Sequence, residues 1–301
     1  MSSRRAIGRT VRLAIACALA LVLVPDSTGS PAAISLTTVD TAKRVDFGED
    51  IVWVLVLGSD ARPGEDVNKG NTDAIHLVGI DGRTGRAVGI GIPRDSWLEL
   101  PGFGFDRINQ ALIEGGDELV ADVVEELVGI RPDYVLVTGF DGFVAMMSAV
   151  GPIEVIAPEG FSNGGTVVKE GLNTFDPDQV LDFVRYRLTL VGDDFARSAN
   201  QQRVLVATLK QMRRQEDDEG FMERATLAAL GGLETDLGPT ELYRFAQAVT
   251  QVDPRKVSSC VLPGEPSNQF GASVVLLDED AARRIGADAS DDTRLQDGCE
   301  P

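Results

Sequence analysis

The chain has 301 residues, of which 43% are apolar, and a formal net charge of −19. This length allows one large domain or two small ones, and the apolar fraction is ample for a sizeable core. Because the chain has no general basic field that could collect phosphates, the charge argues against a nucleic-acid partner. Any phosphate chemistry must therefore depend on locally clustered arginines.

The first 25 residues combine a basic start with the apolar run LAIACALALVLV (13–24). This run is shorter than the roughly 20 residues that span a bilayer. Residues 1–25 are therefore predicted to be a signal peptide or a short membrane anchor, with cleavage favoured and an uncleaved anchor as the rival. We expect an exported, extracytoplasmic protein that is associated with the cell membrane or the cell wall. Residues 26–46 are rich in Ser, Thr, Ala and Asp and are predicted to be a linker.

Cysteine usage agrees with export. Loss of Cys17 with a signal peptide would leave Cys260 and Cys299, an even pair in the C-terminal part. In an oxidising compartment this pair predicts a disulfide, with two unpaired cysteines as the alternative.

Three apolar runs follow the linker. IVWVLVL (51–57) is a continuous run of strand length, which is typical of a strand buried on both faces. AIHLVGI (74–80) and AVGIGIP (87–93) are joined by DGRTGR, whose Asp-Gly and Thr-Gly steps predict a hairpin. Helices are therefore expected to cover a central sheet.

Charged residues stand at the ends of these predicted strands. Asp73 precedes the first hairpin strand and Arg94 follows the second, so the two should be neighbours at one edge of the sheet. If strand 51–57 runs parallel to strand 87–93, Asp60 and Arg62 emerge at that same edge. Clefts outside strand ends are where open α/β sheets bind ligands.

The middle of the chain alternates between helix and strand patterns, which predicts an α/β fold. The predicted elements are a helix over 117–130, a strand over 133–140, a short helix over 141–151 and a strand over 153–158.

A helix is predicted to begin at Asp176, with Pro177 at its first position and Gln179 at its third. Arg185 and Arg187, two residues apart, would share one face if the chain leaves the helix there and becomes extended. Both guanidinium groups could then face one ligand.

The remaining chain is assigned to the same domain. Arg197 and Gln201 stand at the head of a long predicted helix. Further helices are expected around 221–230 and 240–250, with a short strand over 257–263. The acidic end 288–301 is predicted to be mobile except where Cys299 holds it.

Most of the singled-out polar residues fall at predicted element ends, and two carboxylates with several arginines suit a metal-bound pyrophosphate. Phosphoryl transfer needs mainly positioning and charge neutralisation, which this set supplies. The alternative is that these are ordinary strand-end ion pairs or solvated surface charges. The set comprises Asp60, Arg62, Asp73, Arg94, Arg185, Arg187 and Arg197.

Six blocks, in their order and spacing, resemble the motifs of the LytR-CpsA-Psr family of cell-wall enzymes. They are VLVLGSDAR, NTDAIHLVGID, IGIPRDSWLELPGFGFDRINQAL, FDGFVAMMSAVGPIEV, LDFVRYR and DDFARSANQQRVL. The match runs from about Ile51 to Leu209. The resemblance implies a catalytic domain over 47–290 followed by an acidic tail over 291–301. It also implies a three-layer α/β/α fold with a central mixed β-sheet flanked by helices on both faces.

The resemblance further implies an activity. Such enzymes move a glycopolymer from a polyprenyl-pyrophosphate carrier onto a peptidoglycan hydroxyl through a phosphodiester bond, and release polyprenyl phosphate. The substrates would be reached at the outer face of the cytoplasmic membrane. A non-catalytic polyprenyl-phosphate-binding or regulatory protein and a polyprenyl-pyrophosphate phosphatase are the alternatives.

The matching motifs also imply roles for individual residues of this chain. Asp60 and Asp73 would hold Mg²⁺, with Mn²⁺ as a substitute. The pyrophosphate would be bound by Arg94, Arg185, Arg187 and Arg197, supported by Arg62 and Gln201. Asp95 or Asp194 would orient Arg94 or the acceptor, so that Arg94, Asp73 and Asp95 form the expected catalytic set.

Two positions depart from the family pattern. Asn71 stands two residues before Asp73, where the family usually has arginine, and Asn200 stands where a second arginine is common. Charge compensation at the site is therefore expected to be weaker, which affects the expected rate or substrate more than the fold. His76, the only histidine, lies inside an apolar run and is interpreted as a sheet residue rather than a catalytic base.

Overall fold

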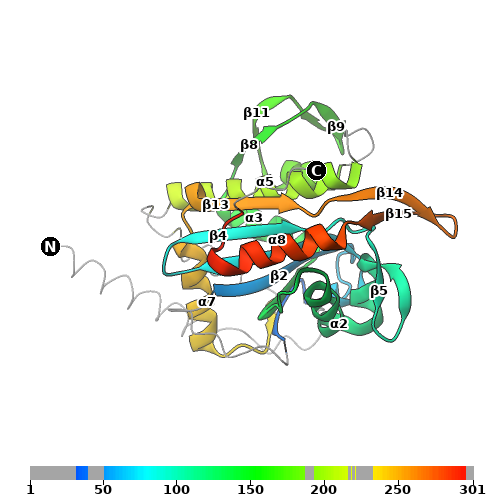
Figure 1. The fold of residues 1–301 in the computed structure, drawn as a ribbon. Coiled ribbons are helices and arrows are strands. Elements are labelled where there is room, and N and C mark those ends of the chain that lie inside the picture. Colours follow the sequence, from blue (N-terminus) through cyan, green and yellow to red (C-terminus); the bar gives the residue numbers. More distant parts are fainter. Residues whose placement is uncertain are drawn as a thin grey trace.

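The computed structural model describes residues 32–39, 51–186, 193–215, 218, 221 and 233–295. Its centre is a seven-stranded mixed sheet with the strand order β12-β1-β7-β2-β3-β4-β13 (Figure 1). The strands of this sheet are β1 (Ile34–Thr38), β2 (Ile51–Ser59), β3 (Thr72–Asp81), β4 (Arg86–Gly91), β7 (Tyr134–Thr138), β12 (Leu233–Thr235) and β13 (Val257–Val261). The mixed α/β fold predicted from the sequence is confirmed.

Helices and small hairpins surround the central sheet. The α-helices are α2 (Ala111–Val128), α3 (Phe140–Val150), α4 (Pro177–Arg185), α5 (Asp193–Arg214), α7 (Pro239–Gln251) and α8 (Glu279–Asp292). The two-stranded sheets pair β5 (Trp97–Leu100) with β6 (Gly104–Arg107), β8 (Ile153–Ala157) with β11 (Gly171–Phe175), β9 (Phe161–Asn163) with β10 (Thr166–Val168), and β14 (Gly264–Gln269) with β15 (Ala272–Leu277). The predicted strand over 153–158 therefore exists, but it lies in a two-stranded sheet outside the central sheet.

Strand β2 shows why the central strands are apolar throughout. Leu55 and Leu57 pack in a core cluster that includes residues of α2 and α8. Val52 and Val54, on the opposite face, pack in a cluster that includes Leu242 of α7. Because side chains alternate between the two faces of a strand, burial on both faces requires a continuous apolar run. In Figure 1, α8 lies across the front of the sheet.

The register of β2, β3 and β4 determines which residues meet at one edge. β3 pairs antiparallel with β2, with Leu55 opposite Leu77, and antiparallel with β4, with Leu77 opposite Ile90. β2 and β4 therefore run in the same direction and end beside the start of β3. The predicted hairpin and the shared edge are both confirmed.

Helix α4 begins as predicted. The Asp176 side chain accepts a hydrogen bond from the Gln179 backbone N–H, and the Gln179 side-chain oxygen accepts one from the Asp176 backbone N–H, so the two form a capping box. The helix ends at Arg185, and Tyr186 has an extended backbone. Arg187 lies outside the described residues, so the shared face predicted for it and Arg185 stays a prediction.

The linker prediction for 26–46 is wrong at Ile34–Thr38, which forms β1. This strand pairs antiparallel with β7 and parallel with β12, and Ile34 and Leu36 are buried. A run of only five residues with two apolar positions is too short to show a period above its Ser- and Thr-rich surroundings. Pairing with β7, about a hundred residues later, stabilises it as a strand.

The C-terminal prediction also needs correction, because α8 extends into the segment interpreted as a mobile acidic end. Asp278 caps this helix by accepting from the Ala281 backbone N–H. A Cβ atom at Gly286 would come within 1.8 Å of the Val128 carbonyl oxygen, so α8 and α2 pack with almost no space between their backbones. The buried residues of α8 are Ala and Gly, and such small side chains gave little apolar signal in the sequence.

Several predictions concern residues outside the described ranges, namely the N-terminal segment 1–25, most of the helix expected over 221–230, and Cys299. Cys260 is buried in β13, and its disulfide with Cys299 stays a prediction. Among the residues that the structure describes, no helix is both long and apolar enough to cross a bilayer.

Candidate active site

The predicted sheet edge carries an ion pair. Asp73 lies at the start of β3 and Arg94 follows the end of β4, and an Arg94 guanidinium nitrogen donates to the Asp73 carboxylate. Both side chains are largely buried, with 25% and 18% of their surfaces exposed. The neighbourhood predicted from the hairpin is therefore confirmed.

Asp95 lies between two arginines. Its Oδ1 is 3.6 Å from Nε of Arg94 and 3.7 Å from a terminal guanidinium nitrogen of Arg107. Arg107 had no assigned role in the sequence analysis. Arg107 reaches the site because the β5–β6 hairpin reverses the direction of the chain and places Arg107 opposite Trp97. The segment PGFG, in which Gly102 and Gly104 both have φ of 85°, was the sequence signal for this turn.

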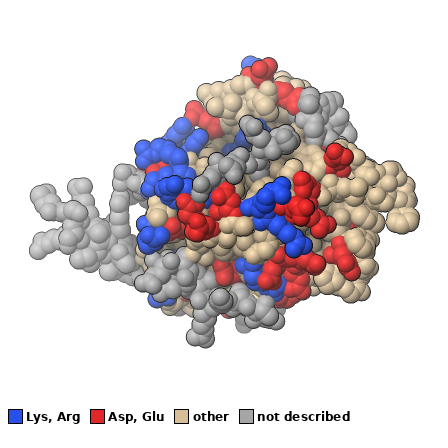
Figure 2. All heavy atoms as spheres, viewed as in Figure 1, with Lys and Arg blue, Asp and Glu red and all other residues tan. Residues whose placement is uncertain are grey.

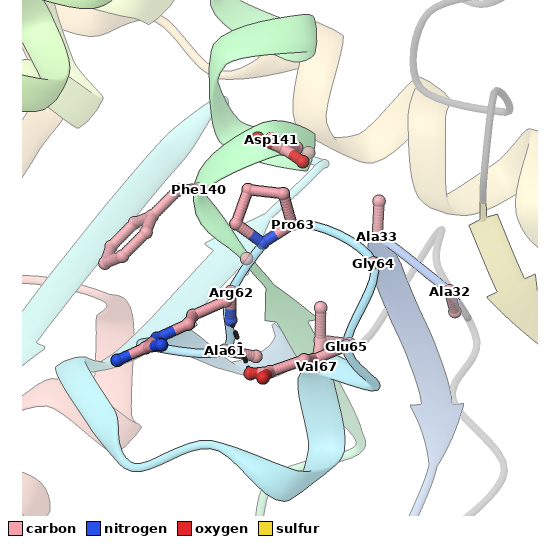
Figure 3. Close-up of a pocket in the computed structure, with 12 residues that line it drawn as sticks. Ala32, Ala33, Ala61, Arg62, Pro63, Gly64, Glu65, Val67, Phe140 and Asp141 are labelled. Carbon is pink, nitrogen blue, oxygen red and sulfur yellow. Dashed lines mark hydrogen bonds between the residues drawn. The ribbon is translucent and has the colours of Figure 1, made fainter. Parts of the chain in front are cut away.

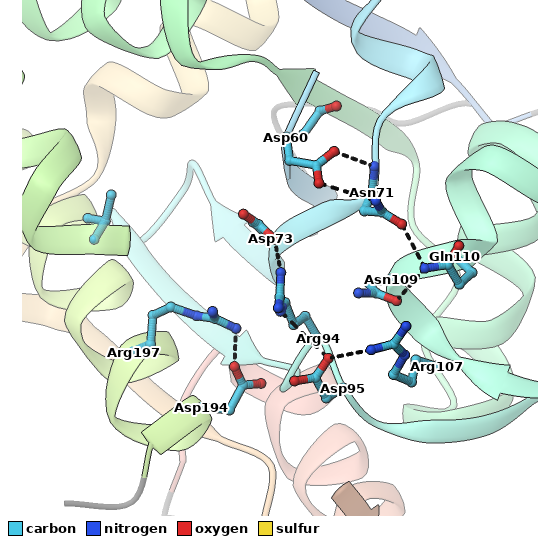
Figure 4. Close-up of polar contacts among 12 residues, drawn as sticks. Asp60, Asn71, Asp73, Arg94, Asp95, Arg107, Asn109, Gln110, Asp194 and Arg197 are labelled. Atoms are coloured by element: carbon cyan, nitrogen blue, oxygen red, sulfur yellow. Dashed lines mark hydrogen bonds and ion pairs between the residues drawn. The ribbon is translucent and has the colours of Figure 1, made fainter. Parts of the chain in front are cut away.

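Helix α5 adds a second, more deeply buried ion pair near its start. The Arg197 guanidinium donates to the Asp194 carboxylate one helical turn earlier, and both residues are buried. The Asp95 backbone N–H also bonds to Asp194, and Arg94 lies close enough to interact with it electrostatically. Figure 4 shows these side chains converging. We refer to the set as the ion-pair cluster, which consists of Asp73, Arg94, Asp95, Arg107, Asp194 and Arg197.

Burial and charge oppose each other in this cluster. Burial disfavours the charged form of Arg94, but the carboxylates of Asp73 and Asp95 outweigh it and raise the pKa of Arg94. Burial raises the pKa of Asp194 and prevails over the lowering effect of Arg197. Each guanidinium of the cluster thus faces at least one carboxylate, so the charges of the cluster compensate one another.

Gln201 joins three elements behind the ion-pair cluster. Its amide nitrogen is 3.3 Å from the carbonyl oxygens of Asp73 and Val184, and donates to both. Its Oε1 lies 3.0 Å from Nε2 of His76. Since an amide oxygen can only accept, Nε2 of His76 carries the hydrogen. Gln201 thus contacts the site through the backbone of Asp73, and its role in supporting a bound pyrophosphate stays a prediction.

His76 is a sheet residue, as predicted, and is buried in β3. Burial lowers its pKa from 6.5 to about 4, against a smaller opposing effect of the Gln201 hydrogen bond. The ring is therefore neutral near pH 7 and holds the Gln201 amide in one orientation.

Asn71 is uncharged and does not compensate the charge of Asp60, but it orients the Asp60 carboxylate through hydrogen bonds. The two oxygens of the Asp60 carboxylate accept from the Asn71 backbone N–H at 2.7 Å and from its side-chain amide at 3.2 Å. Gln110 donates in turn to the Asn71 side-chain oxygen at 2.7 Å (Figure 4). Asn200, the second departure from the family pattern, is buried and accepts from Arg203 along its own helix at 2.9 Å.

Arg62 and Arg185 both lie beside Phe140, the first residue of α3. Arg62 lines an open pocket together with Gly139 and Phe140 (Figure 3). Cζ of Arg185 lies 4.2 Å from the centre of the Phe140 ring, in a cation–π contact. β2 and β7 are parallel, so the residues that follow them meet at the same edge. We call this region the Phe140 pocket.

The donor chemistry of the edge fits a hard divalent cation. Among the described residues no group of three or more His, Cys, Asp or Glu side chains could form a complete metal cage. Mg²⁺ does not require one, because it is commonly held by one or two carboxylates together with substrate phosphate oxygens. Each carboxylate offers about four lone-pair sites. Asp60 and Asp73 therefore retain acceptor capacity beside the bonds that orient them.

Comparisons with known proteins identify the family and the fold. The LytR_cpsA_psr family model matches residues 27–290. The chain is 36% identical over 155 residues to the "Probable cell wall biosynthesis protein LcpB" of Corynebacterium glutamicum, covering 47% of this chain and 37% of that protein. It is 31% identical over 182 residues to the "Polyisoprenyl-teichoic acid--peptidoglycan teichoic acid transferase TagT" of Bacillus subtilis, covering 57% of this chain and 56% of TagT. These alignments span only about a third to a half of the relatives' lengths.

A solved structure shares the fold. The "LytR-CPS2A-psr family protein YwtF (TagT) with bound octaprenyl pyrophosphate lipid" superposes with a TM-score of 0.64 at 22% identity. The superposition covers 86% of this chain and 96% of that one. The family model spans most of the chain and the fold agrees, so this protein belongs to the LytR-CpsA-Psr family.

Proposed function

We propose that the protein is a Mg²⁺-dependent phosphotransferase that attaches a lipid-linked glycopolymer to peptidoglycan. The observation that carries the proposal is the ion-pair cluster at the sheet edge, where Arg94 and Arg197 stand beside carboxylates. Family membership supports it, as do the teichoic acid transferase activity for which TagT is named and the octaprenyl pyrophosphate bound in the YwtF structure. The reaction would take place at the outer face of the cytoplasmic membrane, which is the location expected from the N-terminal segment.

In this reaction the acceptor hydroxyl oxygen attacks the phosphorus atom that carries the glycan. The bond from that phosphorus to the bridging oxygen breaks, and its electron pair leaves with polyprenyl phosphate. The hydroxyl proton passes to a carboxylate of the site or to water. The product is a phosphodiester between glycan and peptidoglycan.

The residues of the chain would share the work. Arg94 and Arg197 bind the pyrophosphate oxygens and stabilise the negative charge that develops in the transition state. Asp95 holds the Arg94 and Arg107 guanidinium groups in position. Arg62 and Arg185 bind phosphate oxygens from the Phe140 pocket. Asp60 and Asp73 would hold Mg²⁺, which neutralises charge on the pyrophosphate when it is bound.

A coupling assay tests the proposal. The purified protein is incubated with a polyprenyl-pyrophosphate-linked glycan, Mg²⁺ and a peptidoglycan fragment, and the products are separated by mass. We expect a coupled glycan–peptidoglycan product, which Asp73→Ala should abolish. If wild type yields neither a coupled product nor phosphate-ester cleavage and cannot be distinguished from Asp73→Ala, the proposal is wrong.

A second candidate is a non-catalytic polyprenyl-phosphate-binding or regulatory protein. Asn71 favours it, because this neutral side chain holds Asp60 where the family usually has a cation. Native mass spectrometry separates the two candidates, since a co-purified lipid that is never turned over supports the binder. A phosphatase would release polyprenyl phosphate in the coupling assay without forming the coupled product.

A further inference from the structure

Aromatic side chains are exposed on two hairpins beside the candidate site. Phe105 of β6 is 62% exposed, and Phe270, at the turn between β14 and β15, is 97% exposed. Trp97 of β5 contacts Phe270 with ring centres 6.3 Å apart. Isolated exposed apolar residues are normal, but a continuous aromatic surface of this kind indicates a binding surface.

The pairing of β5 with β6 places these side chains on one face. Trp97 is opposite Arg107, and Glu99 is opposite Phe105. Successive side chains of a strand alternate between its faces, so Trp97, Glu99, Phe105 and Arg107 share a face. The intervening Leu98 is buried on the other face, against the core.

The two hairpins are joined by backbone contacts. The Val275 N–H donates to the Asp95 carbonyl oxygen at 2.9 Å, and Ser96 forms a parallel bridge with Val275. Phe270 therefore lies beside Trp97 because β14–β15 is fixed against the start of β5. We name this surface the aromatic strip and define it as Trp97, Glu99, Phe105, Arg107 and Phe270.

The aromatic strip is continuous with the candidate site. Arg107 belongs to both, since its guanidinium approaches Asp95 of the ion-pair cluster. From there the strip passes to Trp97 and then to Phe105, a diagonal neighbour at about 7–8 Å across the hairpin. A polymer that reached the ion-pair cluster with one end could lie along this face.

The charges near the strip discriminate between two kinds of occupant. No charged residue occurs between Pro266 and Leu277, and Figure 2 shows the projecting β14–β15 hairpin with few charged atoms. However, Glu99 lies exposed within the strip, and the whole chain carries a net charge of −19. A carboxylate among the aromatic rings opposes insertion into lipid, and the net charge opposes approach to an anionic membrane.

A glycan matches the same features. The C–H faces of sugar rings stack on aromatic rings, while sugar hydroxyl groups hydrogen-bond to carboxylate and guanidinium groups. We propose that the aromatic strip binds the glycan strand of the peptidoglycan acceptor and guides its hydroxyl toward the ion-pair cluster. This inference rests on the proposed function, because it identifies the occupant of the acceptor side of that site.

Intrinsic fluorescence offers a direct test. The chain has only two tryptophans, and Trp53 is buried in the core, so a change in emission on binding reports on Trp97. The full chain is titrated with soluble, uncrosslinked peptidoglycan glycan strands. In a parallel titration it meets vesicles of phosphatidylcholine and phosphatidylglycerol. We expect a saturable emission change with the glycan strands and none with the vesicles.

Variants locate the interaction. Phe105→Thr and Phe270→Asn should each weaken glycan binding about five- to tenfold, which corresponds to losing one aromatic contact. Asn suits position 270 because the backbone there has φ of 51°. Phe105→Tyr, which keeps a ring, should bind like wild type. Leu172→Thr is the matched control, because Leu172 is 64% exposed on the separate two-stranded sheet of β8 and β11.

Three results would overturn the inference. One is an emission change with the vesicles and none with the glycan strands, which would make the strip a membrane contact. Another is the absence of any saturable binding to either. The third is unchanged glycan binding by Phe105→Thr and Phe270→Asn when their circular dichroism shows that they are folded.

Native mass spectrometry with a polyprenyl pyrophosphate keeps failure of the inference apart from failure of the proposed function. If the wild type binds this lipid but no glycan, only the acceptor strip is wrong. If it binds the glycan strands but no polyprenyl pyrophosphate, the proposed function is wrong, and the strip is a glycan-binding surface without the transfer role.

Discussion

The arginines at the sheet edge lie in two different environments. In the ion-pair cluster, Arg94 and Arg197 are mostly buried and each faces a carboxylate. At the Phe140 pocket, Arg62 and Arg185 are exposed, and Arg185 rests on an uncharged aromatic ring. The same residue type thus occurs in a charge-compensated setting and in a solvated one.

The difference matters for how a pyrophosphate would bind. In the cluster, phosphate oxygens must replace or share the carboxylate partner of each arginine, and removing one member leaves the other buried without compensation. A divalent cation that engaged Asp73 would release Arg94 for phosphate. At the Phe140 pocket, no carboxylate of the described residues pairs with Arg185. We therefore expect large effects from changes in the cluster and small ones at the pocket.

Arg94→Ala should give the largest effect. It leaves the Asp73 and Asp95 carboxylates without their shared partner, and it removes a donor to the pyrophosphate. We expect transfer activity to fall about 10²- to 10³-fold and unfolding free energy to fall by about 3–5 kcal/mol. The coupling assay and denaturant unfolding measure the two effects. Arg244→Ala, an exposed arginine on α7, is the control, and an Arg94→Ala variant as active as that control would contradict the cluster's role.

His76 gives the next largest effect, on stability at acid pH. Its pKa of about 4 in the folded protein is below its ordinary 6.5, so the unfolded chain takes up a proton between these pH values and the folded protein does not. Stability should therefore fall as pH decreases from 6.5 to 4, by about 3 kcal/mol from this residue.

His76→Leu removes the titrating group, so its unfolding free energy should depend less on pH over that interval. Denaturant unfolding at pH 7 and pH 4.5 measures the change in unfolding free energy for each protein. The carboxylates titrate in both proteins, so their effects cancel in the comparison. Parallel pH profiles for wild type and variant would show that His76 does not titrate as described.

The sequence predicted those parts of the fold that have a strong local pattern. β2 and the β3–β4 hairpin were evident because each strand is a long apolar run and the connection carries turn residues. β1 and α8 were missed for opposite reasons. β1 is too short to show a period and depends on pairing with β7, whereas α8 buries Ala and Gly, whose small side chains do not stand out.

In the candidate site, too, contacts set by a local pattern could be predicted and contacts between distant elements could not. The Asp73–Arg94 pair could be predicted because one hairpin brings both residues to one edge. Arg107 and Gln110 could not, since their positions depend on the β5–β6 turn and on the chain that follows it. The contact of Arg185 with Phe140 joins α4 to α3, and no local pattern connects these two residues.

Asn71, which holds Asp60, permits a gain of function. Asn71→Arg would place a guanidinium where the amide now meets Asp60, which adds a fork suited to phosphate. We expect binding of a polyprenyl pyrophosphate with Mg²⁺ to tighten about tenfold, measured by titration calorimetry. Asn71→Lys adds the same charge without the planar fork and should gain less. If neither variant binds more tightly, Asn71 does not limit charge compensation at the site.

The smallest effect is expected at the Phe140 pocket. Phe140→Leu keeps an apolar side chain but removes the ring beneath Arg185, so this guanidinium loses its cation–π contact and a preferred position. Because such contacts contribute about 0.5–1 kcal/mol at exposed sites, pyrophosphate binding should weaken only about two- to fivefold. Phe140→Tyr keeps the ring and should bind like wild type in the same calorimetric titration. A loss as large as that of Arg94→Ala would mean that the pocket, rather than the ion-pair cluster, provides the principal phosphate contacts, and the contrast between buried and exposed arginines would be reversed.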